Sequence, residues 1–127
     1  MDDDLSVTLD SESRSPARAR RALSHFLNVR GVDGEVQHAA LLIVSELVSN
    51  AVQHGRAPIQ LNAAVSDEAL LVEVTDGGTP FDRGVGQAAA ETGRGFAIVE
   101  TLARQWGVAT GAEQGKTVWA ELEATST

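Results

Sequence analysis

The spacing of apolar residues changes abruptly at Pro58. Before it, the apolar positions of 16–28 and 35–54 recur three and four residues apart, which predicts two helices with one buried side each. After it, alternation over 59–65 and 70–74 predicts the two strands of a β-hairpin. Helices followed by paired strands indicate a layer of helices on a sheet, and not the alternating pattern of a doubly wound fold.

Segments on either side complete the predicted element order. Alternation over 5–9 predicts a short first strand, a third helix fits 95–106, and a last pair of strands fits 107–110 and 117–122. The order indicates an α+β two-layer sandwich, with a mixed, mostly antiparallel sheet covered on one face by about three helices. The glycine- and alanine-rich stretch 82–93 has no clear period, and connectors of that length are often functional lids.

Two helix ends carry recognisable signals. Ser15 precedes Pro16, so the Ser side chain is expected to cap the first helix, at whose first position Pro is well tolerated. Gly55 follows the last periodic residue of the second helix, where a residue in the left-handed conformation is commonly needed.

The composition fits one soluble globular domain that spans residues 1–127. The chain is 43% hydrophobic and 22% charged, near the averages for folded domains. No run approaches the roughly 18 apolar residues of a membrane span, and the acidic start at 1–4 does not resemble a secretory signal. We therefore expect a cytoplasmic protein without membrane association. Because the sequence has no cysteine, disulfides and thiolate metal sites are excluded.

The charge balance argues against nucleic acid as a direct partner. A net charge of −8 leaves too few clustered cations to neutralise phosphates. Four arginines nevertheless fall in one short N-terminal stretch, namely Arg14, Arg18, Arg20 and Arg21. They indicate either a solvated helix face or a docking patch for a partner protein, and the sequence leaves both open.

Glu46 and Asn50 are the most informative pair of polar residues. They are four apart in the predicted helix 35–54, so they lie on one face, one turn apart. The amide oxygen of Asn50 can ligate a hard cation such as Mg²⁺, and the carboxylate of Glu46 can orient or deprotonate a nucleophile. The alternative is an ordinary amphipathic helix with a polar stripe.

Two further segments have the composition of a nucleotide site. Asp76-Gly77-Gly78 ends a predicted strand, so the glycines let the backbone approach a flat ligand while the acceptor-only carboxylate binds an amine such as that of adenine. A simple Asp-Gly turn is the alternative. Gly93-Arg94-Gly95 precedes the third helix, where backbone N–H groups and the helix dipole suit phosphate. It matches neither the dinucleotide fingerprint nor a P-loop.

Taken together, in this order and spacing, the motifs resemble the GHKL (Bergerat-type) histidine-kinase-like ATP-binding domain. The run 45–55 is similar to its N-box, and 82–93 to its ATP lid. The Asp76 and Gly93 segments are similar to its two glycine boxes, and Gly115-Lys116-Thr117-Val118-Trp119 to its final motif, where a Thr lies beside the adenine. Within that superfamily the chain most closely resembles anti-sigma-factor serine/threonine kinases of the RsbW/SpoIIAB type.

The resemblance implies a role for each site residue. Glu46 would be the general base, Asn50 the Mg²⁺ ligand, and Asp76 the acceptor for the adenine amine. The residues that it assigns to nucleotide binding are Asn50, Asp76, Gly78, Gly93, Arg94, Gly95 and Thr117. Among them Gly78 allows close approach of the base, Gly93-Arg94-Gly95 cradles phosphates, and Thr117 supports the adenine through water. The chain departs from the family at Pro80, where Gly is usual, since Pro stiffens the loop and removes an N–H donor.

The resemblance also implies a function and partners. A bacterial protein of this type binds ATP and Mg²⁺, sequesters a sigma factor and phosphorylates a Ser or Thr of an anti-anti-sigma (STAS-type) protein, so that it regulates transcription. Homodimers are common in the family, and Leu23 and Phe26 of the first helix are candidate dimer contacts. The alternative is a non-catalytic, nucleotide-dependent module that only binds its partner. The presence of Glu46 favours catalysis, because a pure binder needs no base there.

Overall fold

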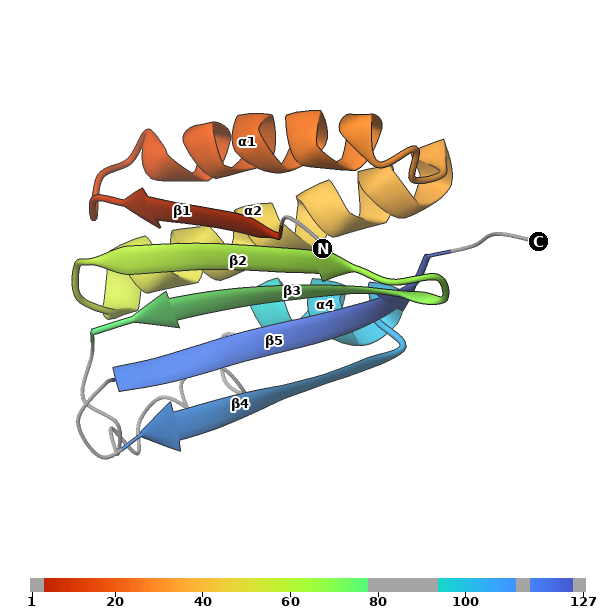
Figure 1. Ribbon diagram of the computed structural model, residues 1–127. Coiled ribbons are helices and arrows are strands. Elements are labelled where there is room, and N and C mark those ends of the chain that lie inside the picture. The colour runs from red at the N-terminus through yellow and green to blue at the C-terminus, as the bar shows by residue number, and fades with distance from the viewer. Residues whose placement is uncertain (1–3, 78–93, 112–114, 125–127) are drawn as a thin grey trace.

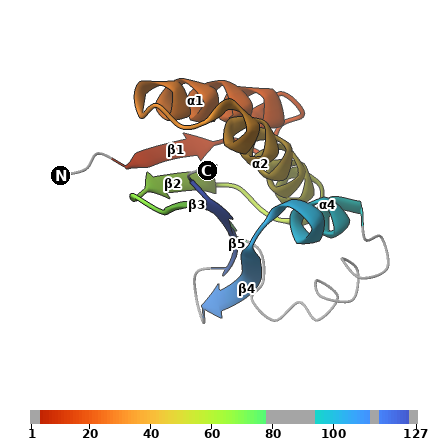
Figure 2. The same ribbon diagram turned by 90° about the vertical axis from the view of Figure 1, so that its right-hand side faces the viewer.

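The computed structural model describes residues 4–77, 94–111 and 115–124. Its elements are β1 (Leu5–Leu9), α1 (Ser15–Val29), α2 (Gly34–His54), β2 (Ile59–Val65), β3 (Ala69–Asp76), α4 (Arg94–Leu102), β4 (Gln105–Gly111) and β5 (Gly115–Glu123). Within this part of the chain the helices form one layer on one face of a five-stranded sheet (Figures 1 and 2). The predicted α+β sandwich and its element order are confirmed.

The strands are arranged in the order β1-β2-β3-β5-β4, and each neighbouring pair of described strands is antiparallel. Along β3 and β5, buried and partly buried residues alternate, as expected when one face of a sheet is covered. The buried residues point toward the helices, and the others form the outer face of the sheet. This alternation decides which side chains of β3 and β5 can meet.

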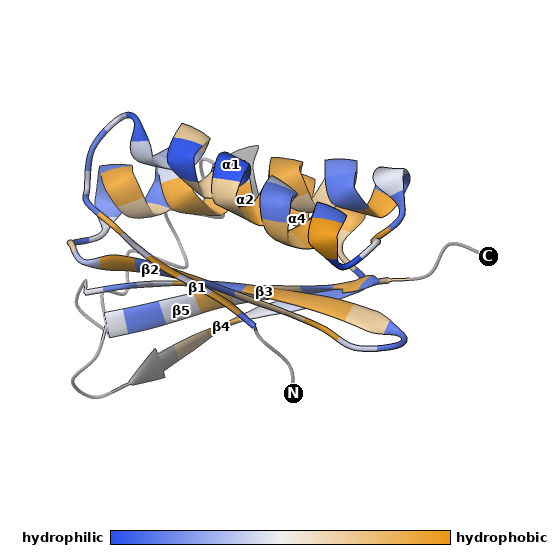
Figure 3. Cartoon of the chain, turned by 45° about the horizontal axis from the view of Figure 1, so that its top comes forward, coloured by the Kyte–Doolittle hydropathy of each residue, from blue (hydrophilic) through white to orange (hydrophobic). Residues whose placement is uncertain are grey.

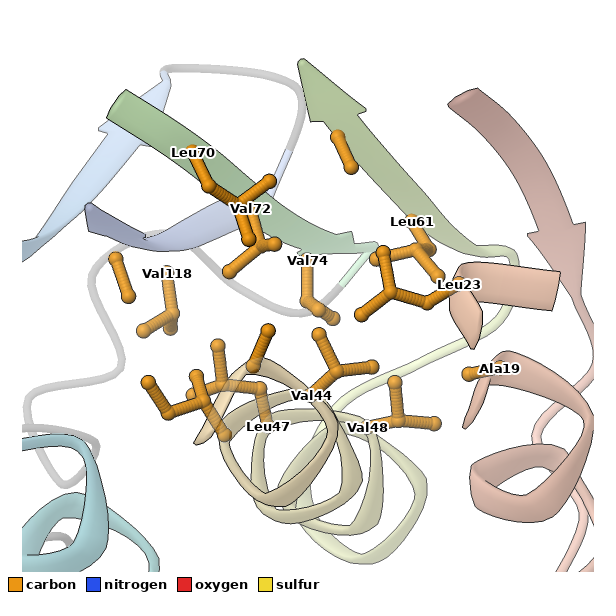
Figure 4. Packing of buried hydrophobic residues seen from close by; sticks show 14 of the residues in the cluster. Ala19, Leu23, Val44, Leu47, Val48, Leu61, Leu70, Val72, Val74 and Val118 are labelled. Carbon is orange, nitrogen blue, oxygen red and sulfur yellow. The ribbon is translucent and has the colours of Figure 1, made fainter. Parts of the chain in front are cut away.

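The core lies between the helix layer and the sheet. Figure 3 shows that the apolar sides of the helices and the sheet face each other. Side chains that meet there include Leu23, Val44, Leu47, Val48, Leu61, Leu70, Val72, Val74 and Val118 (Figure 4). Burying one such aliphatic side chain contributes about 1.5–3 kcal/mol, so this layer is the main source of stability.

The first helix contributes Leu23 and Phe26 to this core. Their exposed fractions are 0% and 9%, and both belong to the buried cluster. Neither side chain is therefore available at the surface, and the expectation that they serve as dimer contacts is wrong. The physical reason is that α1 lies over β1 and beside α2 with its apolar side inward (Figure 2).

The start of α1 differs from the prediction. The hydroxyl of Ser15 donates to the carbonyl oxygen of Asp10 at 2.5 Å, and the N-cap residue is Arg14, which makes no side-chain capping bond. Ser15 thus holds the helix to the end of β1 and does not cap it, so the predicted Ser15 cap is wrong. The side chain is 1% exposed, which leaves the hydroxyl dependent on this partner.

The turn between the two long helices follows a known helix-ending pattern. Gly31 has φ 72°, its N–H donates to Asn28, and the N–H of Val32 donates to the carbonyl of Leu27 at 3.0 Å. These two bonds with a left-handed glycine form a Schellman motif. The side chain of Asp33 then accepts from the N–H of Glu35 at 3.0 Å and caps α2. The two helices are thereby placed side by side.

The third helix is shorter than predicted. It ends at Leu102 instead of residue 106, and β4 begins at Gln105. The N–H of Arg104 donates to the carbonyl of Glu121 at 2.7 Å, and Trp106 lies opposite Ala120 in the sheet. The chain therefore joins β5 before another helical turn can form. None of the described helices is long and apolar enough to cross a membrane.

Candidate functional site

The site is built around a buried ion pair at the end of β3. Asp76 and Lys116 lie opposite each other on β3 and β5, and Oδ2 of Asp76 accepts from Nζ of Lys116 at 2.9 Å. Their side chains are 3% and 10% exposed. Both point to the helix side of the sheet, because they share a face with the buried Val74 and Val118. A charged side chain so far from water needs such a partner.

Gly55 lies directly against the carboxylate of Asp76. A Cβ atom at Gly55 would lie 2.5 Å from Cγ of Asp76 and 2.6 and 2.7 Å from its two oxygens. The φ angle of Gly55 is −102°, which any residue adopts, so the predicted left-handed conformation is wrong. Gly55 is required here because a larger residue has no room. The N–H of Gly77 donates to the carbonyl of Arg56 at 2.8 Å, which ties the end of β3 to the same segment.

Glu46 and Asn50 lie on α2, as predicted, and both are half-buried. The α1 side of this helix is marked by Ser45, whose Oγ accepts from Nη1 of Arg20 at 2.9 Å. Glu46 lies about 100° further around the helix, because an α-helix has about 3.6 residues per turn. Because the buried residues of α2 lie between these two directions, Ser45 and Glu46 are on opposite sides of the buried face. Since α1 and α4 flank α2 on opposite sides (Figure 2), Glu46 and Asn50 lie on the α4 side.

These polar residues follow one another along α2. At about 1.5 Å per residue, Asn50 lies about 7.5 Å, and Glu46 about 13.5 Å, along the axis from Gly55. Asp76 is in contact with Gly55 at the C-terminal end of the helix. The carboxylate of Asp76 on β3, the amide of Asn50 and the carboxylate of Glu46 thus follow one another in that order along the axis of α2. Such a row can contact an elongated ligand at three points.

The second predicted glycine box lies at the start of α4. Helix α4 begins at Arg94, so Arg94 and Gly95 occupy its first turn, where backbone N–H groups lack intrahelical partners. Gly78, Pro80, Gly93 and the predicted lid at 82–93 lie outside the described residues, as do the side chains of Arg94 and Gly95. The phosphate-binding roles of these residues remain predictions.

Thr117 does not lie with the other predicted site residues. Its Oγ1 is 2.7 Å from Oγ1 of Thr75, which is its partner across β3 and β5. Because successive side chains of a strand point to opposite faces, this pair lies on the outer face of the sheet. The structure therefore separates Thr117 from Asp76 and places Lys116 beside the carboxylate instead.

Lys116 is the site residue that the sequence analysis missed. Its signal was nonetheless present, because the small and aliphatic residues Val118, Ala120 and Leu122 recur at every second position. Counting back by two from this apolar series puts position 116 on the buried face and position 117 on the outer face. A charged residue in a buried series needs a partner of opposite charge, and Asp76 is the residue that meets it.

The arginines near α1 behave as a solvated helix face. Arg18, Arg20 and Arg21 are exposed. Arg14 pairs with Glu12, with Nε and Oε1 3.1 Å apart and both side chains largely in water. Exposed pairs of this kind contribute little to stability. A role of these residues in docking a partner remains a prediction.

A hollow of 310 Å³ lies elsewhere, near the edge of the sheet formed by β1. It is lined by Asp4, Leu5, Ser6, Asn62, Ala63, Ala64, Leu71 and Glu73. None of the predicted site residues lines it. This hollow is therefore separate from the site at Asp76.

Comparison with known proteins assigns the chain to a family. The model of the histidine kinase-like ATPase domain matches residues 9–122. The chain belongs to this family. The matched region includes Glu46, Asn50, Asp76 and Lys116, so the site lies within this ATPase domain. A search of curated proteins found no match.

The ATPase domain is also similar to a solved structure, the crystal structure of the RsbU and RsbW domains of Rv1364c from Mycobacterium tuberculosis. The TM-score is 0.78 and the sequence identity 25%, over 99% of this chain and 34% of that one. The domain thus spans 34% of the length of its neighbour. The family match and this likeness confirm the predicted GHKL, RsbW-like fold.

The residues of the site suit the ligand that the family implies, which is ATP, usually with Mg²⁺. The carboxylate of Asp76 is acceptor-only when ionised, and the amino group of adenine is a donor. The amide oxygen of Asn50 is of the type that hard cations prefer. Lys116 adds a donor next to the carboxylate, which the resemblance did not include.

Proposed function

We propose that this ATPase domain is an anti-sigma factor, which sequesters a sigma factor and phosphorylates a Ser or Thr of an anti-anti-sigma (STAS-type) partner. The observation that carries the proposal is the row of Asp76, Asn50 and Glu46 along α2, in a chain that belongs to the histidine kinase-like ATPase family. The likeness in fold to a structure that contains an RsbW domain supports the regulatory part.

Each residue of the row has one task in this proposal. Asp76 binds the amino group of adenine, and Asn50 offers its amide oxygen to the magnesium that accompanies the phosphates. Glu46 takes the proton of the partner's hydroxyl as that oxygen bonds to the γ-phosphorus and the bond to the departing ADP breaks. Phosphoryl transfer depends mainly on positioning and on neutralised charge. A base of this kind typically contributes about 10²- to 10⁴-fold.

Helix α4 supplies the phosphate contacts in this proposal. Its first turn at Arg94 and Gly95 offers N–H donors at the positive end of a helix dipole. The resemblance assigns further contacts to Gly78, Gly93 and the lid at 82–93, which lie outside the described residues. Pro80 stands where Gly is usual and lacks an N–H donor, so we expect a lower affinity for the nucleotide.

The test is a transfer assay with the purified chain, γ-labelled ATP and Mg²⁺, and STAS-type proteins from the same genome. We expect label on a Ser or Thr of one of them and an equal amount of ADP. If the chain binds ATP and a sigma factor but transfers no label to any STAS-type protein, the non-catalytic binding module is the correct function. If ATP does not bind at all, both functions fail.

A further inference from the structure

Lys116 lies in the proposed base-binding site, and none of the roles that the resemblance implies involves it. Its ammonium nitrogen is 2.9 Å from Oδ2 of Asp76, and its side chain is 10% exposed. It is also the single lysine of the sequence. Any base that reaches Asp76 therefore meets a carboxylate and an ammonium group side by side, and not a carboxylate alone.

The first question is whether a base displaces Lys116 from Asp76. Separating a buried ion pair is unfavourable: the equilibrium constant favours the paired state over the separated one by roughly a hundredfold to several thousandfold. One hydrogen bond from a neutral amine to a charged acceptor increases the binding constant of the base by only roughly ten- to a hundredfold. The comparison favours a ligand that joins the pair over one that breaks it.

The second question is which base edge suits an intact pair. A carboxylate has about four acceptor positions and an ammonium group three donors, so their mutual bond exhausts neither. Adenine carries a donor, its amino group at N6, next to an acceptor, the ring nitrogen N1. We infer that Lys116 is a specificity-determining residue that donates to N1 of adenine while Asp76 accepts from N6.

This inference rests on the proposed function, since it assumes that ATP binds at Asp76. It goes beyond that proposal because it assigns a direct, charged contact to a residue that had no role. It also explains why position 116 tolerates a lysine on a buried face. The ammonium is paired with Asp76 in the protein alone and gains a second acceptor when the base arrives.

The experiment compares ATP with 1-deaza-ATP, in which a C–H group replaces N1, by calorimetric titration in the presence of Mg²⁺. For the wild-type chain we expect 1-deaza-ATP to bind at least tenfold more weakly than ATP, the scale of one charged hydrogen bond. For Lys116→Met we expect the two ligands to differ by less than threefold. Lys116→Arg, which keeps a charged donor, restores most of the wild-type ratio. A ratio that is the same in wild type and Lys116→Met overturns the inference.

A second measurement needs no substitution and covers the case in which Lys116→Met does not fold. Because the chain has one lysine, labelling with [ε-¹³C]lysine gives a single side-chain NMR signal. We expect saturating Mg·ATP to shift it and inorganic triphosphate with Mg²⁺ to leave it in place. A signal unmoved by bound ATP overturns the inference and leaves the proposed function intact. Absence of ATP binding to the wild type overturns both.

Discussion

Gly55 and Asp76 are in closer contact than any side chain at position 55 would allow. Gly55, at the end of α2, packs directly against the carboxylate, and a Cβ at this position would lie 2.5 Å from Cγ of Asp76. The carboxylate cannot move aside without leaving Lys116, to which it is bound at 2.9 Å. The position of the proposed base-binding group is therefore fixed by a glycine at the end of α2.

The first prediction concerns this contact. We expect Gly55→Ala to displace the carboxylate and to weaken ATP binding at least tenfold, since the hydrogen bond to the base depends on its position. We also expect a loss of stability of about 1–3 kcal/mol from overpacking. Calorimetry with Mg·ATP and urea unfolding measure the two effects.

Gly34→Ala is the matched control for this change. Gly34 is at the opposite end of α2 from Gly55, and a Cβ there meets nothing within 4 Å. The nucleotide affinity of the Gly34→Ala variant should equal that of the wild type. If Gly55→Ala binds ATP as tightly as Gly34→Ala, the carboxylate of Asp76 is not the group that holds the base.

A second prediction concerns the energetics of the buried pair. We expect Asp76→Asn to lower the free energy of unfolding by about 3 kcal/mol, because it leaves the ammonium of Lys116 buried beside a neutral group. The double variant Asp76→Asn/Lys116→Met should regain at least half of the loss, since neither charge remains. A double-mutant cycle by urea unfolding measures the coupling. Additive losses would show that the two side chains do not interact in solution.

A third prediction separates binding from transfer. We expect Glu46→Gln to bind ATP within threefold of wild type and to lose at least about a hundredfold in transfer to the STAS-type partner, the scale of a lost general base. Glu35→Gln is the control, because Glu35 is an exposed acid on the same helix and should transfer normally. Equal transfer rates for the two variants would remove Glu46 from the catalytic role.

A fourth prediction concerns the role of α1. We expect Leu23→Ala to cost about 2–5 kcal/mol, because it leaves a cavity where a fully buried side chain was. Val29→Ala on the same helix should cost less than about 0.5 kcal/mol, since Val29 is 68% exposed. Thermal or urea unfolding measures both. Similar losses for the two variants would contradict the burial of this side of α1.

The element order and the core could be predicted from the sequence because the spacing of the apolar residues is clear. Leu23 and Leu47 each belong to a series of apolar residues at helical spacing, and Leu61 and Val72 belong to segments in which apolar residues recur at every second position. The end of α4 could not be predicted in this way. Trp106 fits a helical period as well as a strand, and its place was decided by pairing with Ala120, which is a contact between distant segments.

The site was predictable in its residue types but not in its register. Glu46 and Asn50 are local to one helix, so their spacing alone predicts that they share a face. The partner of Asp76 depends instead on how β3 and β5 align, and a shift of one residue exchanges the two faces. The resemblance placed Thr117 beside the adenine, whereas the register puts Lys116 next to Asp76, and the alternation of β5 was the sequence signal for this.

Calorimetric titration with Mg·ATP shows whether this ATPase domain binds an adenine nucleotide through Asp76. We expect saturable binding of one ATP per chain, weakened at least tenfold in Asp76→Asn and unchanged in Gly34→Ala. A folded wild-type protein that gives no binding heat and no ligand-induced NMR shifts at millimolar ATP, or an Asp76→Asn variant that binds as tightly as wild type, would contradict it.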